Sequence, residues 1–510
     1  MSGMSLPPLL RTDTLERPEN QDVNTDILRP VNFSQTGCKF VFQRKGILDS
    51  NSQLSLQQTV EDSTHAGSDT GAVCPTSTGA LAMIQRAWLT IGGRRISNLD
   101  DCADWNTWKR LHYTDEYLKG IVIPKQGGND TFGGSTQREI LADSTTSINA
   151  RGFVAPYGVL GRESSEFSIS DVGDATFGTQ VDTGSDTRDI ARNRLTPFAS
   201  STPTFAVGLS QIIPLLATGL QLPLFAIKEE VAINIEWAKN TVNYRFTASE
   251  LAPDTIGAVS AADMTSTMIQ DGVFIMADYL YYPDRMADVE DEIMTRGGYD
   301  VPYDEILTTT SYTTYAAGQI TNNYQIVAGG RKVKSIVVQK SVEPTVATPL
   351  VGANNLGVHN STAFKNGVSP QLNIDAKNWY SQPITNQSLL KCCADSVESV
   401  PLSLNSYRMS FKGLPFGVAP APVLPSGLSD RKVNNFSQAP ESGSQAWVGI
   451  KLENQFGQGV RVSNLPMIYS ESINVDTDDI IVPKNNRKVK IFIKTQQLLN
   501  IAGGLVEMIE

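Results

Sequence analysis

The chain has 510 residues, more than one hydrophobic core usually supports, so we expect two or three domains. Hydrophobic residues make up 40% of it and charged residues 19%, which is ordinary for a folded globular protein and excludes a disordered one. The formal net charge of −11 argues against a broad nucleic-acid-binding surface, because neutralising phosphates requires clusters of Lys and Arg.

Basic and cysteine residues are too scattered to indicate a binding site. The short basic pairs lie beside predicted strands or turns, and we interpret each as a solvated loop edge; they are Arg94-Arg95, Arg331-Lys332 and Arg487-Lys488. The five cysteines have no metal-ligand spacing and are expected to be reduced, mostly buried thiols; they are Cys38, Cys74, Cys102, Cys392 and Cys393. The first residues lack the pattern of a secretory signal, and no apolar run is long enough to span a membrane.

Residues 1–30 are polar and punctuated by proline. We predict an extended N-terminal arm that becomes ordered on a partner surface. Because acidic residues balance the arginines in this segment, it does not have the character of a genome-binding arm.

Residues 88–111 predict a strand, a tight turn, a second strand and a short helix. Leu89 and Ile91 alternate with Thr90, and Gly92-Gly93 can supply the positive φ that a tight hairpin requires. We expect Asn98 to cap a helix that begins at Leu99, with Asp100 and Asp101 at its positive end. One stripe of this helix is predicted to pack against the sandwich; its members are Cys102, Trp105, Trp108 and Leu111.

The rest of residues 31–282 is mainly of β character. Strands are predicted from Phe40 and Phe42 around Val41, and from Leu54 and Leu56 around Ser55. Residues 231–237 alternate cleanly, with Val231, Ile233, Ile235 and Trp237 on one face, as in an antiparallel sandwich. A further strand is expected from Val273 towards Tyr282, after a turn at Asp271-Gly272. The long polar segments 124–151 and 161–204 are predicted to be functional or interface-forming loops.

Pro283 is expected to end this first β region and Asp284 to cap a linking helix. Met286, Val289 and Ile293 have helical spacing, and Gly297-Gly298 would stop the helix. More strands follow, so the sequence predicts two β-sandwiches in tandem; these strands cover residues 324–327, 333–338, 447–450, 460–462 and 489–493.

The sequence contains no motif of a catalytic, cofactor-binding or metal site, and we predict a protein that is not an enzyme and carries no cofactor. The histidines, His65, His112 and His359, have no triad or zinc context. Residues 127–134 are glycine-rich but lack the end of a phosphate loop, and residues 182–186 lack the ligand positions of an EF-hand. The acidic run 288–292 is interpreted as the solvated face of the linking helix. We interpret the N-glycosylation sequons as chance matches; they are at Asn32, Asn129, Asn360, Asn386 and Asn435.

Four segments, in order, resemble the double jelly-roll major capsid proteins of virophages, polinton-like viruses and nucleocytoplasmic large DNA viruses. They are Ile91–Ile96 with Trp105 and Trp108, Leu222–Ile227 leading into Val231–Glu236, Tyr279–Ile293, and Asn485–Arg487 through Gly503-Gly504-Leu505. Two features depart from the family pattern. Arg94-Arg95 replaces a polar glutamine, and Asn435-Phe436-Ser437 is followed by Gln438 where the giant-virus members have arginine.

The resemblance implies an all-β fold of two tandem eight-stranded jelly rolls, with a few short helices and long loops. It implies a first jelly roll over residues 31–283, and a linking helix with the second jelly roll over residues 284–510. It further implies a major capsid protein, localised in the virion after assembly inside the host cell. Pseudo-hexameric homotrimers would tile the icosahedral shell of a double-stranded DNA virus, with penton and minor capsid proteins as partners. Sequence-specific nucleic-acid binding and a membrane span are not expected.

Two other classes of protein are compatible with tandem sandwiches. A receptor- or carbohydrate-binding protein, such as a spike or lectin, would present aromatic platforms on exposed loops. A β-sandwich glycosidase would need two opposed carboxylates. The first is the main alternative to a capsid protein.

Overall fold

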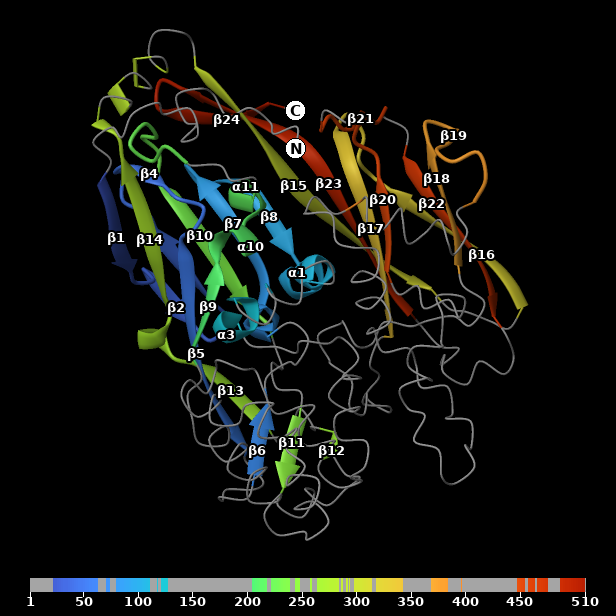
Figure 1. The fold of residues 1–510 in the computed structure, drawn as a ribbon, viewed down its shortest axis with the longest axis horizontal. Helices are drawn as coiled ribbons and strands as arrows, with labels where there is room; N and C mark the ends of the chain where they lie inside the picture. The colour runs from blue at the N-terminus through green and yellow to red at the C-terminus, as the bar shows by residue number, and fades with distance from the viewer. Residues whose placement is uncertain are drawn as a thin grey trace.

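The computed structural model describes the sheets and helices of two β-sandwiches lying side by side (Figure 1). The described residues are 22–62, 70–73, 79–110, 117, 121–126, 204–217, 222–238, 244–247, 257–258, 264–283, 286–287, 290–291, 293, 298–313, 318–342, 368–383, 396, 447–454, 457–463, 466–475 and 487–509.

The first sandwich consists of a six-stranded and a five-stranded antiparallel sheet. The six-stranded sheet has the order β1 (Asp22–Leu28), β14 (Phe274–Tyr281), β5 (Gln53–Asp62), β13 (Met264–Met268), with β4 (Ile47–Leu48) on β14 and β9 (Thr204–Gly208) on β5. The five-stranded sheet has the order β2 (Asn32–Ser34), β3 (Gly37–Val41), β10 (Val231–Trp237), β7 (Ile84–Ile91), β8 (Arg94–Asp100). A small sheet of β12 (Gly257–Ala258), β11 (Tyr244–Thr247) and β6 (Thr70–Val73) lies beyond one end (Figure 1).

The second sandwich has a six-stranded and a four-stranded antiparallel sheet. The larger has the order β15 (Tyr299–Thr313), β23 (Arg487–Ala502), β17 (Lys332–Val342), β20 (Trp447–Lys451), with β21 (Val460–Arg461) on β17 and β24 (Leu505–Ile509) on β23. The smaller has the order β16 (Gly318–Ile326), β22 (Met467–Val475), β18 (Val368–Ile374), β19 (Lys377–Asn378).

Along the chain, short helices alternate with the strands of the first sandwich. They are η3 (Gly79–Met83), α1 (Cys102–Arg110), α3 (Ile123–Gln126), α10 (Leu209–Ile212), α11 (Pro214–Ala217) and η5 (Gln270–Gly272). Together with the sheets they give the mostly-β architecture with few helices that the sequence predicts.

Alternation of apolar and polar residues explains most of the first sandwich. In β10 the four residues predicted to share a face are buried, and the strand lies between β3 and β7. Leu54 and Leu56 of β5 are fully buried, but Ser55 between them is buried as well. The predicted strand after Gly272 is a single strand, β14, that runs to Tyr281.

The larger sheet of the second sandwich is buried on both of its faces along part of β23. Residues 489–493 are all buried, whereas residues 494–500 alternate between buried and partly exposed. Side chains alternate between faces in a strand, so five consecutive buried residues require cover on both sides. The four-stranded sheet covers one face, and α1 of the first sandwich contacts the other through Trp105 and Phe492.

The structure corrects the predicted start of the helix after β8. β8 continues through Asn98 to Asp100, and α1 begins only at Cys102. Asn98 therefore does not cap a helix; its side-chain amide donates to Asp100 at 3.1 Å. Asp101, with φ of 54°, makes the turn instead, and its carbonyl accepts from the amides of Asp104 and Trp105.

The structure also places part of the predicted N-terminal arm in the first sandwich. Residues 22–28 form β1, which pairs along its whole length with β14, from Asp22 opposite Tyr281 to Leu28 opposite Ile275. Val23 and Ile27 of β1 are 52% and 62% exposed. The apolar residues of this strand therefore do not mark a buried face, and the sequence pattern does not predict the strand.

The segment that we call the linking helix follows β14 and leads to the second sandwich. Pro283, Met286, Ala287, Glu290, Asp291 and Ile293 have helical backbone. The helix therefore begins at Pro283, and Asp284, its predicted cap, lies outside the described residues, as does Val289. Ile293 is buried and Glu290 and Asp291 are exposed, as the predicted solvated acidic face requires.

Three tight turns lie at the same end of the sandwiches, where Arg94 pairs with Ile91, Ile374 with Lys377 and Ala502 with Leu505. The tight turn between Ser34 and Gly37 lies at the opposite end of the first sandwich. We call the end with the three turns the short-turn end; it is uppermost in Figure 1.

Candidate functional site

The residues considered for chemistry in the sequence fall mostly outside the part of the chain that the structure describes. This applies to His65, His112 and His359, to residues 127–134 and 182–186, and to every sequon except Asn32, which is exposed on β2. Within the described residues, no group of three or more His, Cys, Asp or Glu could hold a metal ion. The helices in that part of the chain are all too short or too polar to cross a membrane.

Two of the five cysteines can be placed. Cys38 and Cys102 are buried free thiols, as predicted. Burial raises the pKa of both thiols, which keeps them protonated and unreactive. Cys74, Cys392 and Cys393 lie outside the described residues.

A network of buried charged residues lies at the junction between the two sandwiches. Lys490 of β23 forms ion pairs with Asp104 of α1 and with Asp101, the latter at 2.9 Å. The side-chain amide of Gln339 on β17 donates to Asp104 at 3.3 Å. Lys490 and Gln339 are opposite each other in the β17–β23 register, so they point to the same face of the sheet.

The pKa values of the ion pair follow from burial and from the opposite charges. Burial raises the pKa of the Asp104 carboxyl, and the Lys490 ammonium opposes that rise without cancelling it. Burial alone would lower the pKa of Lys490, but Asp104 and Asp101 more than offset it, so its pKa is raised. Lys490 therefore remains a cation that compensates the buried carboxylates.

Apolar contacts surround this ion pair. The ring of Trp105 lies 5.6 Å from that of Phe492, which is two residues from Lys490 on the same face of β23. A Cβ atom added at Gly449 of β20 would lie 2.8 Å from the Trp108 ring, so glycine makes room for this tryptophan. The sequence predicts that the tryptophans pack the helix against the sandwich; the structure shows that both reach the neighbouring sandwich.

Asn106 fixes α1 from the other side. Its amide donates to the carbonyls of Cys102 and of Gln211 on α10, both at 2.8 Å. The helix is thereby held to the first sandwich while Trp105 and Trp108 contact the second.

A second part of the junction lies at the short-turn end. Glu229 accepts from the backbone amide of Val506 on β24 at 3.0 Å and forms an ion pair with Arg94 at 3.3 Å. Arg94 also donates to the carbonyl of Val506, and the amide of Lys228 donates to Gly504 at 2.8 Å. Arg94 and Arg95 are both exposed, as predicted for a loop edge, and Arg94 is in addition a junction residue. Arg95 stacks over Trp88, with its guanidinium carbon 4.7 Å from the ring centroid.

The Gly92-Gly93 turn is adapted to this contact. Both glycines have positive φ, 59° and 78°, as predicted for the hairpin. A Cβ atom at Gly92 would also lie 2.1 Å from the Glu229 carboxylate, so this glycine is needed for the close approach as well as for the turn.

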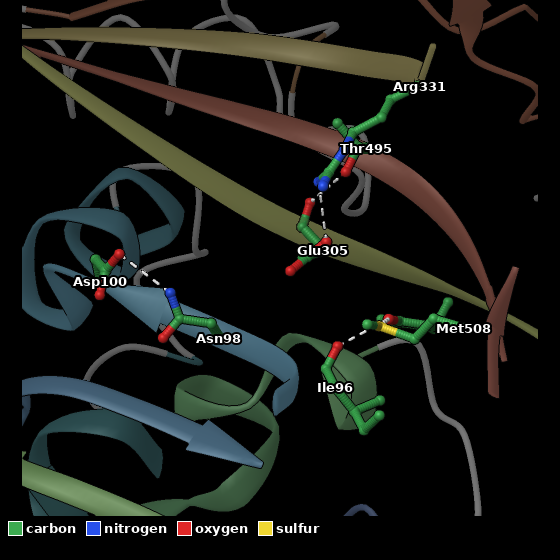
Figure 2. A network of polar contacts seen from close by, with 8 residues as sticks. Ile96, Asn98, Asp100, Glu305, Arg331, Thr495 and Met508 are labelled. Atoms are coloured by element: carbon green, nitrogen blue, oxygen red, sulfur yellow. Dashed lines mark hydrogen bonds and ion pairs between the residues drawn. The ribbon is translucent and has the colours of Figure 1, made fainter. Parts of the chain in front are cut away.

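Between the two parts of the junction, β15 crosses close to β8. The Tyr303 hydroxyl of β15 donates to the carbonyl of Ile96 at 2.8 Å and lies 3.5 Å from the sulfur of Met508. In Figure 2 the carbonyl oxygen of Ile96 is directed at the Tyr303 hydroxyl next to Met508, and Glu305 is drawn with its partners Arg331 and Thr495. Arg331 forms an ion pair with Glu305 at 3.3 Å, so this arginine, too, is not a free loop-edge cation.

The larger sheet of the second sandwich carries a further cluster of buried charged residues. Asp304 of β15 lies 2.8 Å from Lys334 and 3.0 Å from Lys494 of β23. Lys334 is the extra residue of a β-bulge, because Val333 pairs with Thr495 and Ser335 with Lys494. The two ammonium groups share one carboxylate and link three neighbouring strands, which stiffens the sheet on which α1 rests.

The geometry of the junction indicates a mechanical role. Its carboxylates are directed at lysine, glutamine and backbone amide groups and are largely closed to solvent. Buried, mutually satisfied polar networks fix one arrangement of the packed elements. The site therefore holds the two sandwiches at one angle. In the sequence, only the tryptophan stripe points to it; Lys490, Gln339 and Glu229 carry no local signal.

The comparison with solved structures agrees with this architecture. The chain is similar to a structure of the Sputnik virophage solved by cryo-EM, with a TM-score of 0.55 and 11% identity over 97% of this chain and 89% of that one. It is similar to the capsid of the PBCV-1 virus, with a TM-score of 0.51 and 12% identity over 97% and 98% of the two chains. PBCV-1 VP54, fitted into a reconstruction of Sputnik, gives a TM-score of 0.50 at 12% identity, again over 97% and 98%.

No protein-family model and no curated protein sequence matches the chain. At identities this low, the likeness to solved structures shows the fold. The chain therefore has the double jelly-roll fold of the viral capsid proteins that it resembles.

Proposed function

We propose that this chain is a major capsid protein, a structural protein of the virion without catalytic activity. It assembles as a pseudo-hexameric homotrimer that tiles the icosahedral shell of a double-stranded DNA virus. The observation that carries the proposal is that two jelly rolls lie side by side in one chain and overlap virus capsid structures over 97% of its length.

The junction explains how one chain can supply two positions of a hexagonal outline. Three copies of a two-sandwich chain present six sandwiches, and the outline is regular only if the angle within each chain is fixed. Asp104, Lys490, Trp105 and Glu229 fix that angle through buried contacts between the sandwiches. A flexible tether between the sandwiches would not give a repeatable tile.

The tight turns Gly92-Gly93 and Gly503-Gly504, one from each sandwich, lie at the short-turn end. We propose residues 31–283, with β1 added, as the first jelly roll, and residues 284–510 as the linking helix and second jelly roll. Residues 1–21 are proposed as the remaining arm, with penton and minor capsid proteins as partners. The subunit needs no cofactor and no sequence-specific nucleic acid in this role.

Light scattering coupled to size-exclusion chromatography tests the proposal directly. The full chain is expected to elute at three times its mass of 55.4 kDa. Negative-stain electron microscopy of the same fraction should show particles with a hexagonal outline, and concentrated protein should form hexagonal arrays. A monomer at micromolar concentration that binds a glycan or receptor would instead favour the alternative, a receptor- or carbohydrate-binding protein of the spike or lectin type.

A further inference from the structure

Three exposed cations gather at the short-turn end of the second sandwich. Lys332 and Arg461 are directly opposite each other on β17 and β21, and Lys377 follows the turn between β18 and β19. All three are exposed, and within the described residues none of them forms an ion pair with a carboxylate. Like charges directly opposite on neighbouring strands destabilise a sheet unless an anion covers them. We call these three residues the basic turn cluster.

Hydrogen bonds between the turns hold the basic turn cluster in place. The amide of Gly330 donates to Val462 at 3.0 Å, and the amide of Val462 donates to Arg331 at 3.0 Å. Asp375 accepts from the Ser463 amide at 3.2 Å, which ties the β18–β19 turn to the segment after β21. The cations are thus displayed on connected, preorganised turns, a condition that lowers the entropic cost of binding.

The same turns expose an apolar side chain and a left-handed backbone. Val327, in the turn between β16 and β17, is 79% exposed. Asp375 and Ala376 have φ values of 51° and 63°, a conformation that costs energy at a residue other than glycine. An exposed apolar residue beside uncompensated cations is typical of a surface that is covered in an assembly.

The complementary charge lies on the opposite flank of the same chain. The linking helix carries the acidic run of residues 288–292, and its described members Glu290 and Asp291 are exposed. In Figure 1 this helix is the yellow-green segment at the upper left, and β19 and β21 are at the upper right. Both lie at the short-turn end, on opposite sides of the molecule.

We propose that the basic turn cluster of one copy docks on the acidic linking helix of the next copy. Two complementary surfaces on opposite flanks make a head-to-tail contact, which closes into a ring when the rotation allows it. The proposal rests on the homotrimer proposed above and names a contact that forms it. Copies with a net charge of −11 repel one another at long range, so local complementary charge can select the orientation in which they meet.

Charge reversal in the full-length chain tests the contact. We expect K332E/R461E and E290K/D291K each to raise the dissociation constant of the trimer by ~100-fold, measured by light scattering over a dilution series. The four substitutions combined should restore the trimer, because the charges are complementary again. The trimer of the unaltered chain should also weaken as NaCl is raised from low to high concentration.

The control for K332E/R461E is R95E/K125E, which makes the same change in net charge at two exposed cations of the first sandwich and should leave the trimer intact. Circular dichroism spectra should show that every variant is folded; R95E/K125E is expected to melt at a lower temperature, because it loses the contact between Arg95 and Trp88. A trimer that tolerates both reversals, or a combined variant that stays dissociated, overturns the proposed contact while the capsid function stands. A monomeric unaltered chain overturns the proposed function and the contact with it.

Discussion

The ring of Trp105 on α1 lies 5.6 Å from the ring of Phe492 on β23, with 46° between their planes. The two residues belong to different jelly rolls, and both are buried. This contact joins the predicted aromatic helix to a predicted apolar strand that is distant in the sequence. One continuous cluster of buried side chains therefore runs through both sandwiches.

Replacing Trp105 with alanine should weaken the junction. Removal of a buried tryptophan side chain leaves a cavity and costs about 3–5 kcal/mol. The midpoint of urea unfolding should fall. Exchange of the α1 amides with deuterium should speed up relative to the unaltered chain, and more than that of the β10 amides, because the helix loses its contact with the second sandwich. Trp379→Ala is the control, since Trp379 is 40% exposed and its loss should change the unfolding midpoint little. An unchanged midpoint for Trp105→Ala would show that the two sandwiches are held together elsewhere.

Replacing Lys490 with methionine should lower the free energy of unfolding by a similar amount, for a different reason. The substitution leaves Asp104 and Asp101 without their cation, and breaking a buried ion pair on one side costs about 3–5 kcal/mol. Adding Asp104→Asn to the variant should recover part of this loss, because the buried carboxylate is removed. The comparison is Lys39→Met, which breaks the exposed pair with Glu230 and should cost at most about 1 kcal/mol. Equal effects of the two single substitutions, measured by urea unfolding, would argue against a structural role for the buried pair.

The strands of the first sandwich could be predicted from the sequence because their burial is one-sided. Alternation in residues 231–237 and the glycine pair at 92–93 specify a strand and a hairpin without any distant contact. Likewise, the stripe of Cys102, Trp105 and Trp108 predicts a buried helix face. The residues that lie opposite that face were not predictable, because sequence spacing carries no information on which distant strand covers a helix.

Long-range contacts explain what the sequence did not predict at Asn98 and Arg94. Asn98 has the chemistry of a helix cap, but pairing of β8 with β7 continues past it, with Asn98 opposite Trp88. Arg94 is exposed, as predicted, but its partners Glu229 and Val506 come from distant parts of the chain. Local preference is all that a single sequence displays, so contacts of this kind cannot be read from it.

The two glycines of the β7–β8 turn should respond differently to alanine. Both have positive φ, so each substitution should cost about 1 kcal/mol of backbone strain. At Gly93 nothing lies within 4 Å of the added Cβ, whereas at Gly92 the Cβ would displace the Glu229 carboxylate from Arg94 and Val506. Gly92→Ala should therefore lower the unfolding free energy by at least about 1 kcal/mol more than Gly93→Ala. Equal losses in urea unfolding would mean that the Glu229 contacts contribute nothing to the junction.

Tyr279 should make the first jelly roll sensitive to alkali. Burial raises the pKa of its hydroxyl from 10.0 to about 12, because the phenolate would be poorly solvated. Since the folded pKa lies above the unfolded value, the folded state holds the proton more tightly. This contribution to stability is complete below pH 10 and is lost as the pH rises through about 12. Tyr279→Phe removes the ionisable group, so the variant should lose less unfolding free energy between pH 9 and about 12 than the unaltered chain. Tyr312→Phe, at a residue that is 59% exposed, is the control and should follow the unaltered chain. Parallel pH profiles for Tyr279→Phe and the unaltered chain, measured by urea unfolding, would show that this buried hydroxyl does not govern the alkaline limit of the fold.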